Sequence, residues 1–394
     1  SPTIISDLTS TDSPDDGIIT PDTGGNVALG TNSLNSVTTG AHNSALGFDA
    51  LTSNTTGFDN VAIGKDAMRL NTTGYAMTAV GHGALESHTG SGQPRNTALG
   101  WFALGLNETG SKNTAVGDAV LYNNIGGTGY EGNYNTGVGT LALLKNTTGY
   151  SNTGIGAGAL WENTTGYRNT SIGIDALRYN LDGHHNTALG IKSLEENTSG
   201  TYNTAVGEHV LNKNIDGIKN TAIGGYSLFN NVSGTSNTVI GVTAGRDVTG
   251  SGNVLIGHQA GKTQTAISDK LYISNSDTNN LITGDFSTGT VTFNDAYTFP
   301  STDGTASQVL TTDGSGDLSW TTVSGGGGAT DKIEEGNSSV EVIDGGANGH
   351  VMFNTNGTDR WQVTNSGHIL PEATETYDIG SADIKVRHLF LSDN

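Results

Sequence analysis

One spacing dominates this sequence, because a glycine returns about every 17 residues over more than half of the chain. Each glycine belongs to the pattern N-T-A-[LIV]-G-x-x-A-L-x-x-N-T-T-G-Y-x, which recurs from Asn26 to Gly257. Ten of the thirteen intervals between successive glycines are 17 residues, and the others are 19, 22 and 16. The fourteen glycines that close N-T-A-[LIV]-G are Gly30, Gly47, Gly64, Gly81, Gly100, Gly117, Gly139, Gly156, Gly173, Gly190, Gly207, Gly224, Gly241 and Gly257. A short fixed period is typical of a solenoid, in which each repeat packs against its neighbours.

The composition agrees with a solenoid better than with a globular core. Only 33% of the 394 residues are hydrophobic, and 59 are glycine. Such a composition ordinarily indicates disorder, because too little apolar surface is available to offset the ordering entropy. The regular spacing of the glycines argues against disorder and for stacked, individually small repeats.

Within one repeat, glycine and N-T-T-G interrupt every window before a helix could form, and short strands fit better. In N-T-A-L-G, alternation places Thr or Val and the aliphatic residue on one face, with Asn and the small residue on the other. We expect the aliphatic residue to be buried and x-A-L-x to form a second strand. N-T-T-G should supply a turn with a positive-φ glycine. Fourteen coils spaced about 4.8 Å apart predict a rod on the order of 65 Å long.

The small residue two positions before the glycine, for example Ala28, Ala62 or Gly137, has two interpretations. It marks a close approach between chains, or it fits a tight coil. The two longer intervals contain GSGQPR and IGGTGYEGN, which we expect to form loops on one face. One coil buries few side chains, so the rod should still expose apolar surface, which association of several copies would cover.

These repeats carry a resemblance to known families. NTAVGDAVL, NTALGIKSLEENTSG and NTAIGGYSL resemble the head repeats of trimeric autotransporter adhesins and the related repeats of phage tail fibres. The resemblance covers residues 26–262 and implies a left-handed parallel β-roll with three chains side by side. The period of 17 residues is longer than that of the adhesin unit.

The region after the repeat predicts small β-rich modules. We expect an N-terminal attachment segment (1–25), the β-solenoid shaft (26–262), a β-rich connector (263–324), a glycine hinge (325–328) and a C-terminal β domain (329–394). FPSTDGTASQVLTTDGSGDLSWTTVSGGGG resembles a module of phage and prophage fibre proteins. YDIGSADIKVRHLFLSDN resembles the region before the self-cleaving chaperone of many tail fibres.

The resemblance implies a virion fibre, in the tail or another surface appendage, that takes part in host attachment. Its expected partners are two further copies in a homotrimer, other virion proteins through the N-terminal segment, and a host receptor or glycan. A bacterial trimeric surface adhesin is the alternative, and it should carry coiled-coil heptads and the amphipathic strands of a membrane anchor. We find neither pattern in the sequence, so we favour the virion.

A third interpretation is an ice-binding solenoid, since a Thr recurs in each coil. Val27, Val61 and Val254 replace that Thr, which indicates an inward position and disfavours this function.

Other function classes find little support in the sequence. The net charge of −21 disfavours nucleic acid as a partner. There is no cysteine, and no apolar run is long enough to cross a bilayer, so we expect no membrane insertion. No fingerprint for a nucleotide, nucleophile or cofactor occurs in a suitable context, and we expect neither an enzyme nor a cofactor.

A few residues remain as candidates for chemistry. His184 and His185 are adjacent but more typical of a solvated turn than of a metal site. A glycan-cleaving site needs paired carboxylates, and the neighbouring pairs Glu195 with Glu196 and Glu334 with Glu335 are interpreted as solvated charges. Repeat-encoded calcium needs a regular Asp, whereas Asp occurs irregularly here, at Asp49, Asp66, Asp118 and Asp175.

Two recurring features have both a functional and a structural interpretation. Triplets such as Asn54-Thr55-Thr56 match glycosylation acceptors, but we interpret them as side-chain ladders that cap the coils. Aromatic residues follow the turn glycine at Phe58, Tyr75, Tyr150 and Tyr167. They could form an exposed stripe that stacks on sugars, although packing between coils is the favoured interpretation.

Overall fold

The computed structural model describes residues 24–91, 93–306, 308–322, 330–343 and 349–371, without side chains at 330–334. The chain forms two compact units, Ser1–Ser301 and Thr302–Asn394. The boundary between them falls inside the expected connector. The expected glycine hinge, YDIGSADIKVRHLFLSDN and all but the last two residues of the N-terminal segment lie outside the described residues.

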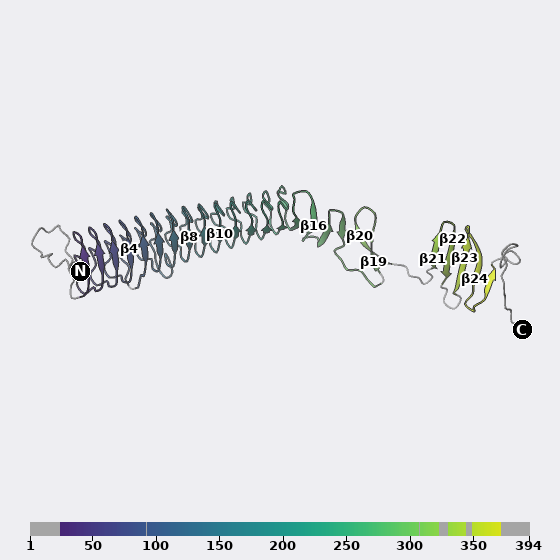
Figure 1. Cartoon of the computed structure of the whole chain (residues 1–394), viewed down its shortest axis with the longest axis horizontal. Coiled ribbons are helices and arrows are strands. Elements are labelled where there is room, and N and C mark those ends of the chain that lie inside the picture. The colour runs from purple at the N-terminus through teal and green to yellow at the C-terminus, as the bar shows by residue number, and fades with distance from the viewer. Residues whose placement is uncertain (1–23, 92, 307, 323–329, 344–348, 372–394) are drawn as a thin grey trace, which may run out of the picture. The chain divides into compact units, whose positions relative to one another are not determined.

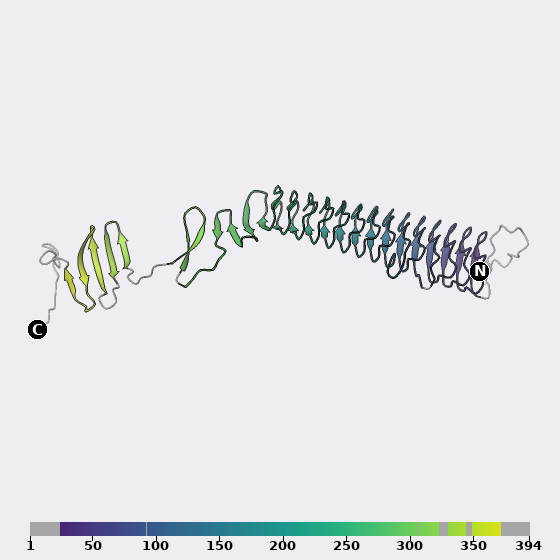
Figure 2. The ribbon, with the colours of Figure 1, turned by 180° about the vertical axis from the view of Figure 1, so that it is seen from behind.

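Unit 1 is a parallel β-solenoid of fourteen three-residue strands, as the repeat predicts (Figures 1 and 2). Consecutive strands pair in parallel with no shift, so that Ala28 pairs with Ala45 and Ala45 with Ala62. Each repeat position therefore forms a straight column along the solenoid. The strands are β1 (Val27–Leu29), β2 (Ser44–Leu46), β3 (Val61–Ile63), β4 (Thr78–Val80), β5 (Thr97–Leu99), β6 (Thr114–Val116), β7 (Thr136–Val138), β8 (Thr153–Ile155), β9 (Thr170–Ile172), β10 (Thr187–Leu189), β11 (Thr204–Val206), β12 (Thr221–Ile223), β13 (Thr238–Ile240) and β14 (Val254–Ile256).

The parallel stack ends in an antiparallel segment of the same sheet. β15 (Lys270–Ser274) still pairs in parallel with β14. β16 (Asn280–Asp285), β17 (Thr290–Phe293) and β18 (Tyr297–Phe299) then follow as antiparallel hairpins. The first part of the expected β-rich connector is therefore a set of short antiparallel hairpins.

Unit 2 contains small antiparallel sheets. β19 (Gln308–Thr312) and β20 (Leu318–Thr322) form a two-stranded sheet. A five-stranded meander consists of β21 (Thr330–Glu335), β22 (Ser338–Ile343), β23 (His350–Thr355), β24 (Thr358–Val363) and β25 (Ile369–Pro371). The all-β class and the small C-terminal modules are thus confirmed.

The orientation of the strand in each coil reverses one prediction. The alternation is correct, but the small residue points inward and the aliphatic residue points outward. Ala62 and Ala98 are 0% exposed, whereas Leu99, next in the chain, is 47% exposed. The interior is narrow because the Leu nine residues into each repeat, for example Leu104, fills it from the opposite wall. Of the two interpretations of the small residue, this packing supports the tight coil.

The last two coils show that the interior conserves volume. Gly245 and Gly261 replace the inward Leu, and the bulky Val239 and Leu255 then replace the small strand residue. A Cβ on Gly245 would lie 2.6 Å from Leu255 Cδ1. Large and small residues thus exchange walls, which keeps the core close-packed.

The expected second strand is absent from the described coils, where x-A-L-x forms turns. Its leucine adopts a left-handed conformation, with φ of 52° at Leu51 and 54° at Leu160. An extended strand requires φ near −120°, so these residues bend the chain. Neighbouring coils still exchange hydrogen bonds there, as Leu51 N donates to Ala67 O at 3.0 Å.

The repeat glycines are required by conformation and by space. All fourteen have φ between 115° and 142°, a region that side chains rarely adopt. A Cβ on Gly173 would lie 2.5 Å from Gly190 O in the next coil.

The N-T-T-G glycine, in contrast, lacks the expected positive φ at Gly57, Gly74 and Gly166. Glycine recurs at this position because there is no room for a side chain: a Cβ on Gly166 would lie 2.4 Å from Asn163 Oδ1.

Candidate functional site

The outward side of β1–β14, which we call the strand face, is a regular surface that follows the parallel strands of unit 1. Each strand presents its first residue, usually Thr, and its last residue, always Leu, Ile or Val. Nine of the fourteen aliphatic side chains are 37% to 47% exposed, and the other five are half-buried. Because the strands pair without shifts, these side chains form one continuous apolar column flanked by a column of Thr. Exposed apolar surface of this extent is typical of an interaction site.

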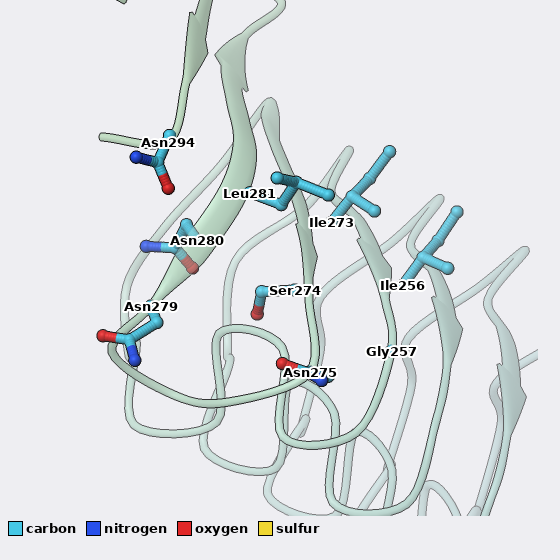
Figure 3. Close-up of a pocket in the computed structure, with 9 residues that line it drawn as sticks. All are labelled: Ile256, Gly257, Ile273, Ser274, Asn275, Asn279, Asn280, Leu281 and Asn294. Atoms are coloured by element: carbon cyan, nitrogen blue, oxygen red, sulfur yellow. The ribbon is translucent and has the colours of Figure 1, made fainter. Parts of the chain in front are cut away.

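The strand face ends at a hollow of about 510 Å³ beside β14–β16. Ile256, Ile273 and Leu281 stand in a row there, with the amides of Asn279 and Asn280 to one side (Figure 3). Leu281 is 61% exposed, and Asn280 Oδ1 is buried without a hydrogen-bond partner. The hollow therefore offers an apolar wall and amide groups to an uncharged partner.

The interior of the solenoid contains two ladders of buried asparagine, one from Asn26 to Asn253 and the other from Asn54 to Asn231. In the first, each strand is preceded by an Asn whose backbone N–H donates to the Asn Oδ1 of the preceding coil, as Asn186 does to Asn169 at 3.0 Å. Its Nδ2 donates to a glycine carbonyl, Gly200 O, at 2.8 Å.

The second ladder joins the Asn side chains directly. Asn163 Nδ2 donates to Asn146 Oδ1 at 2.7 Å and to Gly166 O at 3.0 Å, and Asn163 Oδ1 accepts from Asn180 Nδ2 at 2.7 Å. Both ladders satisfy buried polar groups that would otherwise cost about 1–3 kcal/mol each. Asn54, of the glycosylation-like triplet Asn54-Thr55-Thr56, belongs to this ladder and is 0% exposed, which confirms the ladder interpretation.

One coil departs from both ladders. Met77 replaces Asn in the first and His88 replaces Asn in the second. Asn107 Nδ2 donates to His88 Nδ1 at 3.0 Å, while His88 Nε2 is buried without a partner. Burial lowers the pKa of His88 to about 4, although hydrogen bonds with Asn107 and Gly90 oppose the shift. The neutral imidazole thus continues the ladder as an acceptor.

The aromatic residues that follow the turn glycine pack between coils. Phe58 and Tyr75 stack with ring centroids 4.3 Å apart, and Tyr150 and Tyr167 stack at 4.8 Å. Their faces therefore contact each other, which supports the packing interpretation over an open sugar platform.

His184 and His185 extend this stack. The ring of His184 lies 4.6 Å from Tyr167, and that of His185 lies 4.7 Å from Tyr202. The two Nδ1 atoms are 2.9 Å apart, and Arg168 lies 3.2 Å from His185 Nε2. Desolvation, with smaller contributions from His184 and Arg168, lowers the pKa of His185.

The acidic candidates do not converge on one site in the part of the chain that is described. Glu195 pairs with Lys192 at 3.1 Å, and its other oxygen accepts from Asn212 Nδ2, whereas Glu196 is exposed. Glu335 is exposed, and the side chain of Glu334 is not among those described. No group of three or more His, Asp or Glu side chains among the described residues could hold a metal ion.

The repeat aspartates also act separately. Asp49 accepts from Asn32 Nδ2 at 2.9 Å, and Asp175 pairs with Arg178 at 3.1 Å. Asp66 pairs with Lys65, and Asp118 is exposed. They therefore contribute local pairs rather than a repeated ligand set.

The sequence did not predict a second cluster of aromatic rings. Trp101, Phe102 and Tyr122 surround a pocket of about 400 Å³ together with Ala119, Asn123 and Leu144. The cluster lies in the turns that follow β5 and β6, not on the strand face. The adjacent aromatic pair Trp101-Phe102, which occurs once in the repeat, was the available signal.

Comparisons with known proteins identify no relative. No family model matches the chain, and neither a curated protein nor a solved structure shows significant similarity to it. Within the described ranges, no helix has the length and apolar character needed to span a bilayer.

Proposed function

We propose that this chain forms the shaft of a homotrimeric attachment fibre on the surface of a virus particle. The observation that carries the proposal is the apolar column of the strand face. A soluble single chain gains nothing from a continuous row of half-exposed Leu, Ile and Val. Further copies of the chain would remove this row from water.

The width of the column favours association around a shared axis. One aliphatic side chain per strand makes a narrow stripe, and side chains that point toward a common axis contact both neighbours at once. Because every coil repeats at the same spacing, three copies would match coil for coil along the shaft. The Thr column beside the stripe would lie toward the rim of such an interface.

The role in attachment rests on the resemblance of the repeats and C-terminal modules to those of phage fibres. An antibody against residues 26–262 should label appendages of virus particles in electron micrographs of lysates from cells that carry the gene. Labelling of the bacterial surface, with no labelled particles, would contradict the virion proposal and favour the surface adhesin.

An ice-binding solenoid is a second candidate, because the strand face presents Thr outward. The valines that replace Thr do not mark the inward position that the sequence predicted, because Val27 is 42% exposed. A flat ladder of Thr and aliphatic side chains at strand spacing could contact an ice surface. Thermal hysteresis in a solution of single chains would support this function over the fibre.

A further inference from the structure

We propose that the Trp101 pocket is a subsite that stacks one uncharged sugar ring of a surface glycan. This inference rests on the proposed attachment function and names the class of receptor. The pocket has a volume of about 400 Å³ and is lined mainly by rings and aliphatic side chains, with Asn123 as its polar residue. An apolar, concave lining with few polar groups is the usual composition of a small-ligand site.

Trp101 presents the open surface of the pocket. Its side chain is 55% exposed, and the Phe102 ring meets it edge-on, with centroids 4.7 Å apart and an interplanar angle of 85°. Trp161, the other tryptophan of the solenoid, differs because the Arg178 guanidinium lies 4.3 Å from its ring centroid. Trp101 therefore combines an edge-on contact to Phe102 with an accessible indole.

The neighbouring coils clear space for these rings. A Cβ on Gly83 would lie 2.4 Å from Phe102 Cε1, and a Cβ on Gly105 would lie 2.8 Å from Tyr122 Cε2. Other coils carry Asp66 or Arg69 at the corresponding positions. Phe102 itself has a φ of 47°, an uncommon conformation for a bulky residue. The two glycines leave room for the rings, and Phe102 and Tyr122 meet edge-on at an angle of 86°.

The backbone around the pocket does not offer a strand edge to a peptide. Phe102 N donates to His82 O and Ala119 N donates to Trp101 O, both at 2.8 Å, so these groups are used between coils. A peptide that adds a strand needs such groups to be free. Recognition at this pocket must instead use the faces and edges of the rings.

Charge disfavours an acidic sugar. Asp118 is exposed one coil beyond Trp101, at the same position of the repeat, and the chain as a whole has a net charge of −21. An anionic glycan would be repelled at this site. A neutral hexose or N-acetylhexosamine ring, with a C–H face for the indole and hydroxyl or amide groups for Asn123, fits both the shape and the charge.

The test uses the full chain on an array of purified bacterial surface polysaccharides, neutral and acidic. Wild-type protein should bind neutral glycans, and Trp101→Ala should weaken that binding at least about tenfold, as expected for an aromatic anchor. Ile174→Ala is the matched control, because Ile174 occupies the same repeat position and is 50% exposed. Ile174→Ala should bind glycans like the wild type. A bound neutral oligosaccharide should change the tryptophan fluorescence of Ile174→Ala but not that of Trp101→Phe.

Three results would overturn the subsite: preference for acidic glycans, unchanged binding by Trp101→Ala, or a change in solution mass of Trp101→Ala, which would make Trp101 an assembly contact. Binding of labelled chain to bacterial cells separates this inference from the proposed function. Cell binding without any glycan bound on the array would overturn the subsite and leave attachment standing. Glycan binding that depends on Trp101, without cell binding, would support the subsite and count against attachment.

Discussion

The interior and the strand face of the solenoid invert the usual placement of polar and apolar residues. Each regular coil buries two Asn side chains almost completely, while its strand leaves an Ile, Leu or Val half-exposed. The Asn are buried because each finds partners in the adjacent coil and in a nearby glycine carbonyl. Hydrogen bonding and space, rather than hydropathy alone, therefore decide which side chains this solenoid buries.

The largest effect should come from the contact between coils at the repeat glycine. In Gly173→Ala, the new Cβ meets the Gly190 carbonyl at 2.5 Å with φ near 141°. We expect a loss of roughly 4 kcal/mol or more in the free energy of unfolding, because neither backbone can yield without breaking the column. Guanidinium unfolding at fixed chain concentration measures it. Ile174→Ala, at the adjacent exposed residue, should change stability by less than about 0.5 kcal/mol, and equal losses would refute the steric argument.

The ladders should be the next most sensitive feature. Asn163→Ala removes three hydrogen bonds and leaves Asn146 Oδ1 buried without its partner, whereas Gly166 O keeps the bond from Asn152 Nδ2. We expect a loss of about 3 kcal/mol or more. Ile172→Ser, on the strand face of the next coil, should lower the free energy of unfolding of the dissociated chain far less. A larger loss of stability in Ile172→Ser than in Asn163→Ala, both measured on dissociated chains, would contradict the claim that the buried Asn stabilise the coil more than the exposed aliphatic residues do.

His88 makes one rung of the ladder sensitive to pH. Its pKa is lowered to about 4 by burial, so the folded state binds fewer protons than the unfolded state below the ordinary histidine pKa of 6.5. The contribution of neutral His88 to the free energy of unfolding should therefore be fully present above pH 6.5. It should be lost as the pH drops from 6.5 to 4, by roughly 3 kcal/mol in total. Thermal unfolding across this range measures the loss. His88→Asn, which restores the ladder, should remove this part of the pH dependence, and an unchanged profile would argue against the assignment to His88.

The aromatic stack should contribute least. Tyr167→Ala removes the stacking contacts with Tyr150 and His184, which should cost about 1–2 kcal/mol. Tyr202→Ala, at the more exposed end of the stack, should cost less. Urea unfolding of both variants provides the comparison, and a larger loss for Tyr202→Ala would mean that the stack does not stabilise through its internal contacts.

The sequence predicted the fold class because its strongest signals are local and periodic. The glycine column, the inward Leu such as Leu104 and the ladder Asn such as Asn54 recur at fixed spacing, and each needs only the neighbouring coil for its explanation. Alternation in N-T-A-L-G correctly separated two faces. It could not say which face is inside, since that depends on the Leu of the opposite wall filling the interior.

The errors and omissions have the same physical origin. The turn in x-A-L-x depends on left-handed leucines, which hydropathy does not encode. The Trp101 pocket needs side chains from three successive coils and two glycines that clear space for them. Sequence spacing showed that these coils are adjacent, but not that their rings would meet at the turn rather than on the strand face.

The solution mass of the purified chain, measured by light scattering, tests the central claim most directly. We expect three times the 40.4 kDa chain mass. A variant with Ile155→Asp and Ile172→Asp should fall to the mass of one chain while it keeps a β-rich circular dichroism spectrum, because the charges face the shared apolar column. A wild-type protein that remains a single chain at all concentrations would contradict the claim that further copies cover the strand face.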